Sequence, residues 1–164
     1  MIICLGPVGS GKTLLLKSLK NSSNVDSTTT AVPTNGTDII NIKIEDTSYQ
    51  IRELGGSMAP IWPKYFTNVN KIIYLVDASN LCQISAAGVL LYTVLVHPLL
   101  KNTPILLVLS KMDASYRQMR NEALLMLQMR RLQKEATQKI TITEYSAITG
   151  EGKKDIINWI TQKI

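Results

Sequence analysis

One octapeptide near the start of the chain constrains the fold more than any other feature. It fits the pattern G-x-x-x-x-G-K-[ST] and reads Gly6-Pro7-Val8-Gly9-Ser10-Gly11-Lys12-Thr13. The apolar run 2–5 precedes it, and residues 12–20 after it have the pattern of a helix. A glycine-rich turn between a strand and a helix binds phosphate, because successive backbone N–H groups and the helix N-terminus surround the anion. The chain is therefore expected to hold a phosphate group at this turn.

The side chains of this loop predict how the phosphates are held. Lys12 is expected to neutralise the β- and γ-phosphates of a nucleotide, and the Thr13 hydroxyl to ligate Mg²⁺. The backbone contacts are assigned to Val8, Gly9, Ser10 and Gly11. A phosphate loop alone fits a nucleoside kinase, an ATPase or a GTPase, so other motifs must distinguish these classes.

The rest of the chain alternates apolar runs with helix-like segments, which is typical of a parallel sheet with helices on both faces. Strands are predicted at 2–5, 72–76, 105–109 and 140–145, and helices at 12–20, 81–96, 115–134 and 153–163. Alternating side chains at 40–44 and 49–52, around a polar turn at 45–48, predict a hairpin. We therefore expect a single α/β domain over 1–164, with a mostly parallel six-stranded sheet and one antiparallel edge strand. The polar stretch 21–30 is expected to be a mobile loop.

Composition narrows the setting in which the chain works. With 164 residues, 45% of them hydrophobic, the chain has the size of one compact domain. Its apolar runs are too short to cross a bilayer, and Met1 is followed by a strand-like run that does not fit a signal peptide. Cys4 and Cys82 lie far apart without the spacing of metal ligands, so neither a disulfide framework nor a zinc site is predicted. We expect a soluble, cytoplasmic monomer with reduced thiols.

The net charge of +6 is concentrated in one stretch, 117–139, which has six basic and only two acidic side chains. The stretch could be a solvated helix face, or it could contact acidic lipid headgroups, nucleic acid or an acidic partner. No recognition-helix or RNA-binding motif accompanies it, so nucleic acid is not expected as a partner.

A second motif distinguishes among the phosphate-loop proteins. Ser110-Lys111-Met112-Asp113 follows the apolar run 105–109 and resembles the N/T-K-x-D motif of Ras-like GTPases. The Asp113 carboxylate can accept hydrogen bonds from the ring N–H and the amine of guanine, a donor pair that adenine lacks. The Lys111 stem would lie across the base, and the Ser110 hydroxyl would tie this loop to the phosphate loop. Ser146-Ala147 resembles the S-A motif whose backbone N–H meets the guanine carbonyl. A GTPase is therefore favoured over an ATPase or a phosphate-loop kinase.

Two further segments resemble the switches of Arf and Arf-like GTPases, P-T-x-G and W-D-x-G-G-Q. They read Pro33-Thr34-Asn35-Gly36-Thr37 and Arg52-Glu53-Leu54-Gly55-Gly56-Ser57. This resemblance implies a Ras-like G domain with GTP or GDP and Mg²⁺ as cofactors. It implies that Thr34 contacts Mg²⁺, that Glu53 holds a metal-bound water, and that the Gly56 N–H meets the γ-phosphate. It also implies effectors that bind the switches when GTP is loaded, in Golgi, vesicle or ciliary traffic, with no exchange factor or activating protein named.

Three departures from the family pattern bear on mechanism. Ser57 replaces the glutamine that orients the attacking water, so very slow hydrolysis is predicted. Val8 stands where Ras has glycine, and its branched side chain would obstruct an arginine finger from a partner. Ile2 does not fit the myristoylation pattern and the last residues contain no cysteine, so at most transient membrane contact is expected. These departures leave open a second interpretation. The chain could be a subunit of a protein complex that is stabilised by its nucleotide and hardly cycles between GTP and GDP.

Trp62 and Tyr65, just beyond the second switch, also have two interpretations. They could pack against the sheet as part of the core, or they could form an effector surface that depends on the bound nucleotide.

Overall fold

The computed structural model describes residues 1–20, 32–115 and 117–163 of the chain; the expected mobile loop 21–30 lies outside the described residues. The strands are β1 (Ile2–Leu5), β2 (Thr37–Ile44), β3 (Thr47–Leu54), β4 (Lys71–Asp77), β5 (Ile105–Ser110) and β6 (Ile140–Glu144). The α-helices are α1 (Lys12–Lys20), α2 (Leu81–Leu95), α3 (Arg117–Met126), α4 (Met129–Glu135) and α5 (Lys153–Thr161). The 3₁₀ helices are η1 (Gly56–Tyr65), η2 (Pro98–Leu100) and η3 (Met112–Ala114).

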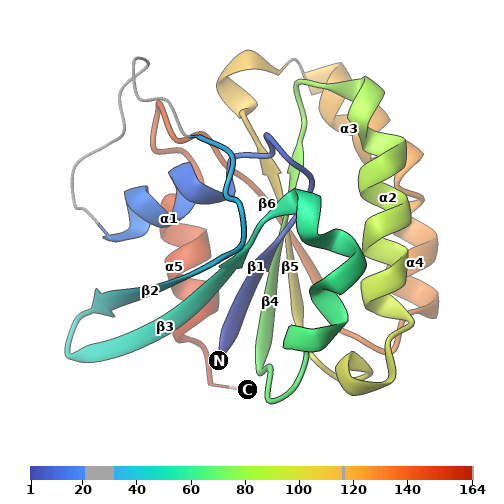
Figure 1. Ribbon diagram of the computed structural model, residues 1–164. Helices are drawn as coiled ribbons and strands as arrows, with labels where there is room; N and C mark the ends of the chain where they lie inside the picture. The colour runs from blue at the N-terminus through green and yellow to red at the C-terminus, as the bar shows by residue number, and fades with distance from the viewer. Residues whose placement is uncertain (21–31, 116, 164) are drawn as a thin grey trace.

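The strands form one six-stranded sheet in the order β2-β3-β1-β4-β5-β6 (Figure 1). Only the β2–β3 pair is antiparallel, and the other neighbours are parallel. The predicted fold class, a mostly parallel sheet with one antiparallel edge strand, is confirmed. In the hairpin Ile44 pairs with Thr47, so the turn consists of Glu45 and Asp46 alone, with Glu45 at φ 53°. The predicted turn was therefore two residues too long.

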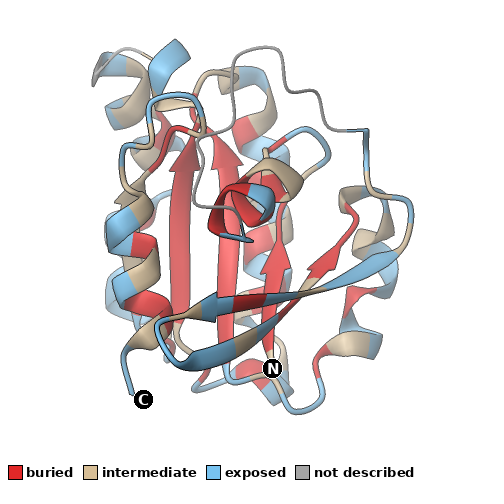
Figure 2. Ribbon diagram, turned by 90° about the vertical axis from the view of Figure 1, so that its left-hand side faces the viewer, coloured by how far each residue is buried: buried red, intermediate tan, exposed pale blue. Residues whose placement is uncertain are grey.

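Alternating side chains of the central strands pack into two separate hydrophobic cores, one on each face of the sheet. Ile3 and Leu5 of β1 pack with buried residues of η1, α2 and α3, whereas Ile2 and Cys4 pack with α1 and α5. Figure 2 shows the central strands as buried along their length and the β2–β3 hairpin as largely exposed. Burial on both faces explains why these strands read as unbroken apolar runs in the sequence.

The predicted helix 115–134 is wrong in one respect, because the structure divides it into α3 and α4. Gln128 lies between them in the left-handed region, at φ 51°. Leu127 and Met129 on either side of it are both buried, at 4% and 2% exposed. Two residues apart on one α-helix would point about 200° apart, so a continuous helix could not place both in the same core. The break permits both to pack.

The parallel strands end at one edge of the sheet, and this edge carries the sequence motifs. The phosphate loop follows β1, the Ser110 motif lies at the end of β5, and Ser146 follows β6. In an open α/β sheet this carboxyl edge is where ligands bind. Among the described residues, no helix is both long and apolar enough to span a membrane.

Candidate functional site

The phosphate loop is held open by glycine backbone conformations and by close packing. A side chain at Gly6 would overlap the carbonyl oxygen of Leu75 in β4, and Gly6 itself has φ 149°. The loop can therefore lie directly on the end of the neighbouring strand only because this residue lacks a Cβ atom. Gly9, Gly11, Lys12 and Thr13 line a pocket with the predicted switch residues Thr34, Glu53 and Gly56, and with Lys111. The structure thus gathers both switch motifs and part of the base motif around one pocket.

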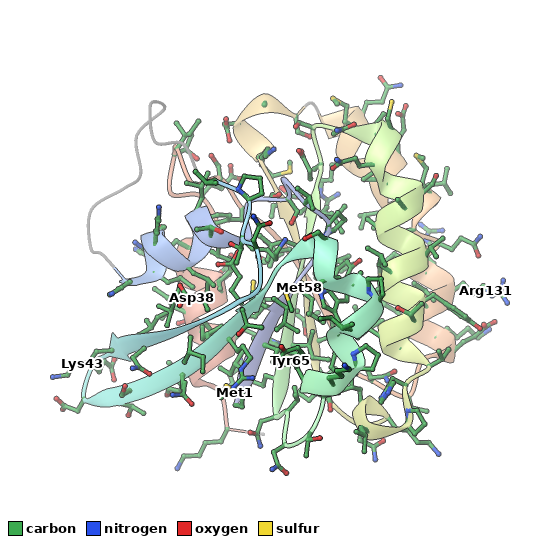
Figure 3. All side chains as sticks on the ribbon, viewed as in Figure 1. Met1, Asp38, Lys43, Met58, Tyr65 and Arg131 are labelled. Carbon is green, nitrogen blue, oxygen red and sulfur yellow. The ribbon has the colours of Figure 1, made fainter. Side chains whose placement is uncertain are left out.

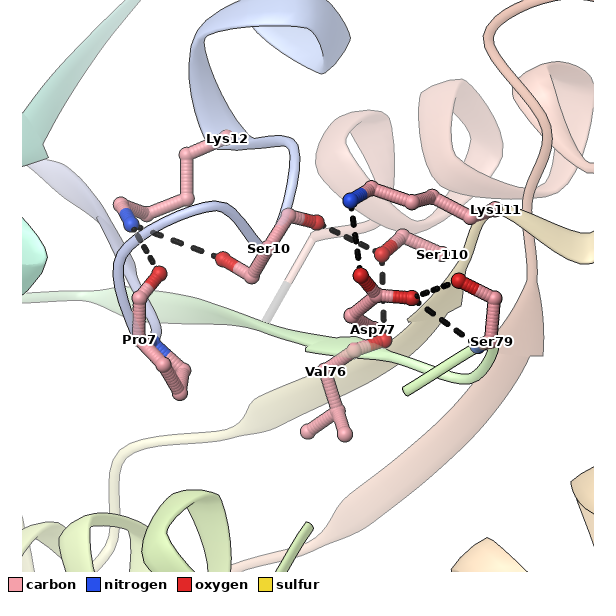
Figure 4. A network of polar contacts seen from close by, with 8 residues as sticks. All are labelled: Pro7, Ser10, Lys12, Val76, Asp77, Ser79, Ser110 and Lys111. Atoms are coloured by element: carbon pink, nitrogen blue, oxygen red, sulfur yellow. Dashed lines mark hydrogen bonds and ion pairs between the residues drawn. The ribbon is translucent and has the colours of Figure 1, made fainter. Parts of the chain in front are cut away.

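Lys12 is a buried cation inside this loop, at 6% exposed. Its ammonium donates to the carbonyl oxygens of Gly6 and Pro7, at 2.9 and 2.8 Å. Figure 4 shows the bond to Pro7. Burial lowers the pKa of Lys12 from its ordinary value, and the charge of Glu53 counts among the effects that offset it. A phosphate group supplies the negative charge that carbonyl oxygens cannot, so the arrangement suits an anionic ligand.

The three residues assigned to Mg²⁺ converge although they come from α1, the first switch and β3. The Glu53 carboxylate accepts hydrogen bonds from the Thr13 and Thr34 hydroxyls, at 2.6 and 3.1 Å. The two hydroxyl oxygens lie 3.1 Å apart. Adjacent ligands of an octahedral Mg²⁺ ion lie about 3.0 Å apart, because the metal–oxygen distance is about 2.1 Å. The two hydroxyls could therefore both ligate one Mg²⁺ ion, with the Glu53 carboxylate beside them.

The glycine pair of the second switch packs tightly against both other parts of the site. A side chain at Gly56 would overlap the backbone of Pro7 and Val8, and one at Gly55 would overlap the carbonyl oxygen of Thr34. Trp62 holds this turn in place, because its indole Nε1 donates to the Gly55 carbonyl oxygen at 3.0 Å. The backbone of Gly56 is thus brought against the phosphate loop.

Trp62 belongs to the core, since it is 1% exposed and packs with the cluster on the α2 face. Tyr65 is half-buried, and the Arg52 guanidinium lies over its ring at 5.4 Å from the centroid. Figure 3 shows Met58 and Tyr65 along η1. Of the two interpretations given above, core packing holds for Trp62.

Ser110 connects the base motif to the phosphate loop. Its hydroxyl is buried and donates to the Ser10 carbonyl oxygen at 2.6 Å, and it lies 3.1 Å from the Val76 carbonyl oxygen (Figure 4). The single hydroxyl thus spans from β5 to the loop that follows β1. This is the connection expected from the sequence.

Asp77 is a site residue that the sequence motifs did not assign. The Lys111 ammonium pairs with its carboxylate at 2.7 Å, and the carboxylate also accepts from the Ser79 backbone N–H and hydroxyl, at 2.9 and 2.5 Å (Figure 4). Asp77 is 6% exposed, whereas the Lys111 side chain is 41% exposed. Lys111 has a left-handed backbone, at φ 57°. A buried carboxylate therefore sets the direction of a lysine that lines the pocket.

The end of β6 brings the last motif to the same edge. The Ser146 hydroxyl donates to the Asp113 carboxylate at 2.7 Å and accepts from the Thr149 backbone N–H at 3.2 Å. Ser146 is fully buried, Ala147 packs against the core on the α1 and α5 face, and Asp113 is exposed. Asp113 is thus oriented by Ser146 while its carboxylate stays accessible to a ligand.

The two residues that depart from the family pattern lie at the pocket and beside it. Val8 is 41% exposed and lines the pocket, and Ser57 is exposed at the start of η1, next to Gly56. The Ser57 hydroxyl is one bond from Cβ, so it extends much less far than a glutamine amide would.

Sequence comparisons agree with this geometry. The model of the ADP-ribosylation factor family matches residues 1–164. ADP-ribosylation factor-like protein 16 of Homo sapiens is 33% identical over 169 residues, covering 98% of this chain and 84% of the human protein. ADP-ribosylation factor 3 of Arabidopsis thaliana is 28% identical, covering 99% of this chain and 87% of the plant protein.

The fold also matches a solved structure, the Arl6 BBS3 small GTPase from Trypanosoma brucei with the bound nucleotide analogue GppNp. The TM-score is 0.82 at 19% identity, over 97% of this chain and 93% of that one. The phosphate loop, both switch motifs and Lys111 of the base motif line one pocket at the carboxyl edge of a six-stranded sheet, and the family match spans the whole chain. The chain therefore belongs to the ADP-ribosylation factor family of small GTPases, which are GTP-binding switches.

Proposed function

We propose that this chain is a GTP-binding switch that cycles slowly, because it hydrolyses GTP far more slowly than family members with a glutamine after the glycine pair. The single observation that carries the proposal is Ser57. Its short, exposed side chain follows Gly56 directly, at the position from which a glutamine would orient the attacking water. The phosphate loop, both switch motifs and Lys111 line one pocket, which supports nucleotide binding by a chain whose chemical step lacks this positioning group.

Mg²⁺ belongs to this proposal as a cofactor held by the hydroxyls of Thr13 and Thr34, with Glu53 on a metal-bound water. The convergence of these three side chains supports it. The ion would neutralise phosphate charge. Because Thr34 belongs to the first switch and Gly56 to the second, loss of the γ-phosphate would release both from the phosphate loop.

The proposed partners are effectors that bind the switches and the β2–β3 hairpin when GTP is loaded. The hairpin supports this, since β2 is an edge strand of mostly exposed residues. The proposed setting is membrane or ciliary traffic from a cytoplasmic pool, at the Golgi or the cilium, which rests on what the family resemblance implies.

The test combines nucleotide binding with a single turnover of hydrolysis on one sample. Fluorescent mantGTP and mantGDP are bound in the presence of Mg²⁺, and unlabelled GTP and ATP compete. Competition by GTP but not by ATP is expected, with hydrolysis of bound GTP slower than the rate of about 3–5 × 10⁻⁴ s⁻¹ of unassisted Ras. Preference for ATP would contradict the assignment of Asp113 to guanine.

A matched pair of variants isolates Ser57. Ser57→Gln restores the family residue and is expected to raise the hydrolysis rate, whereas Ser57→Ala removes only the hydroxyl and should leave it unchanged. If neither variant hydrolyses GTP and wild type releases neither nucleotide over hours, the chain is a non-cycling subunit and not a switch. Fast hydrolysis by wild type would refute the proposal itself.

A further inference from the structure

A second pocket lies at the edge of the sheet opposite the nucleotide site, where the parallel strands begin. Its volume is about 320 Å³. The lining residues are Lys71, Asn102, Pro104, Lys139, Thr141, Trp159, Gln162 and Lys163. Figure 1 places both chain ends at this lower edge, close to the start of β4. Three of the eight lining residues are lysines and none is acidic.

The chain segments beside this pocket contain no carboxylate side chain; the acidic turn of the β2–β3 hairpin, Glu45 and Asp46, lies at the same edge of the sheet but does not line the pocket. Aspartate and glutamate are absent from 66–70, 101–104, 136–139 and 162–163. Among the described residues, no carboxylate forms an ion pair with Lys71, Lys139 or Lys163. The pocket is therefore a concave site whose lysines pair with no carboxylate of the described residues, which favours an anion.

Lys71 is a buried cation in this pocket, at 7% exposed. Its ammonium donates to the carbonyl oxygens of Trp159, Ile160 and Gln162 at 2.9, 2.8 and 2.6 Å, and lies 5.2 Å from the centroid of the Trp159 ring. These contacts fix the end of α5, but carbonyl oxygens and a ring carry no full negative charge. Lys139 and Lys163 are exposed and add two further ammonium groups.

The pocket walls are held together by hydrogen bonds between loops that are distant in sequence. The buried Gln138 amide donates to the carbonyl oxygens of Leu95 and Leu100, both at 2.9 Å. The Ile105 backbone N–H donates to the Lys139 carbonyl oxygen at 3.0 Å. Lys139 is thus placed on a fixed backbone beside the 101–104 loop, so this wall of the pocket is ordered before a ligand binds.

We propose that this pocket binds a phosphate monoester, with the ammonium groups of Lys139 and Lys163 at the phosphate oxygens and Lys71 as a buried charge beneath them. The Asn102 amide and the Thr141 hydroxyl supply neutral donors on the same wall. Ammonium groups bind phosphate as point charges, which suits a site with several lysines and no arginine. The phosphate can come from a lipid headgroup or from a free phosphorylated compound. The proposal does not depend on the mechanism of GTP hydrolysis.

The two tryptophans give separate readouts for the two sites. Trp159 lines this pocket, whereas the Trp62 indole donates to Gly55, the neighbour of Gly56 in the nucleotide pocket. The experiment titrates ¹⁵N-labelled protein, saturated with GDP and Mg²⁺, with inositol 1,4,5-trisphosphate at constant ionic strength. Trp159→Phe assigns the two indole signals. A saturable shift of the Trp159 signal with no shift of the Trp62 signal is expected.

Charge reversal at the exposed lysines tests the assignment. Lys139→Glu/Lys163→Glu should weaken binding about tenfold or more, since each basic residue near an anionic surface contributes roughly a factor of five. The control is Lys43→Glu/Lys154→Glu, which changes the net charge equally at exposed positions that do not line the pocket. Figure 3 shows Lys43 at the far tip of the hairpin. Equal weakening by both double variants, or a shift of Trp159 that never saturates, would overturn the proposal.

Vesicles identify the source of the phosphate. The protein is floated with phosphatidylcholine vesicles that carry either a phosphatidylinositol bisphosphate or phosphatidylserine at equal total charge. Binding only to the phosphoinositide vesicles, lost in Lys139→Glu/Lys163→Glu, assigns a lipid headgroup. Binding of the soluble trisphosphate without flotation assigns a free phosphate ester. Absence of both refutes the site.

Discussion

Asp77 should control how firmly the nucleotide is held, although it has no direct place in the sequence motifs. Its carboxylate lies 2.7 Å from the Lys111 ammonium. Asp77→Asn keeps the size of the side chain and the acceptor for Ser79, but it removes the charge that holds Lys111. Lys111 would then be free to leave the position in which its stem can cover the base.

The size of the effect follows from the exposure of the two partners. Asp77 is 6% exposed, but the Lys111 side chain is 41% exposed, so solvent screens the pair. Exposed ion pairs contribute about 0–1 kcal/mol and hydrogen bonds to charged groups about 1.5–3 kcal/mol. We take about 1 kcal/mol for the pair, which corresponds to a roughly fivefold change in affinity.

The assay is release of mantGDP in the presence of Mg²⁺, followed by stopped flow after excess GDP is added. Asp77→Asn is expected to release mantGDP about fivefold faster than wild type, on the 1 kcal/mol estimate above. Asp155→Asn is the matched control, because Asp155 is an exposed aspartate on α5 that does not line the nucleotide pocket. Its release rate should equal that of wild type.

A double-mutant cycle with Lys111→Met decides whether the pair is the cause. In the Lys111→Met background the charge of Asp77 has no partner to hold, so Asp77→Asn should change release by less than twofold. A fivefold effect of Asp77→Asn that persists in that background would refute the reasoning and assign its effect to general destabilisation. Thermal unfolding of the GDP-free proteins measures that destabilisation separately.

Three further predictions concern other parts of the molecule. Burial raises the pKa of the Cys4 thiol well above its usual range, whereas Cys82 is exposed, so Ellman's reagent at pH 8 should titrate one thiol in the native protein and two after unfolding. Gly56→Ala should lower the affinity for mantGTP at least tenfold more than the affinity for mantGDP, because the added Cβ overlaps the Val8 backbone and displaces the second switch. Equal losses of affinity for the two nucleotides would contradict this contact. Lys71→Met should lower the free energy of unfolding by about 1–3 kcal/mol, because the carbonyl oxygens at the end of α5 lose their donor; urea denaturation measures it.

Most of the fold could be predicted because periodicity marks strands buried on both faces and helices with one apolar side. The predicted bounds of β1 and α1 coincide with the structure, and β5 extends one residue beyond its prediction. The break at Gln128 could not be predicted, because neither glycine nor proline marks it. It arises from the tertiary requirement to bury both Leu127 and Met129 in the same core.

Part of the candidate site could likewise be predicted, because it consists of contiguous motifs. The part that depends on contacts between strands could not. The phosphate loop and the Ser110 motif are local patterns, so their residues could be assigned from the sequence. The pairing of Asp77 with Lys111 depends on the register of β4 and β5, in which Asp77 lies opposite Ser110. An aspartate at the end of a buried parallel strand was the available signal, because such strand ends meet at one edge.

The basic residues of the chain differ in whether they form ion pairs. Within 117–139, Arg131 pairs with Glu135 at 2.9 Å on α4. Arg120 pairs with Glu144 of β6, so a carboxylate from outside the stretch offsets part of its positive charge. Figure 3 shows Arg131 on the outer side of the molecule, where its pairing leaves it solvated. Lys139, by contrast, joins lysines from β4 and the C-terminal segment around one pocket. Since three lysines line a pocket at the edge opposite the nucleotide site, a phosphate-bearing surface bound there would meet the molecule with its switches directed away.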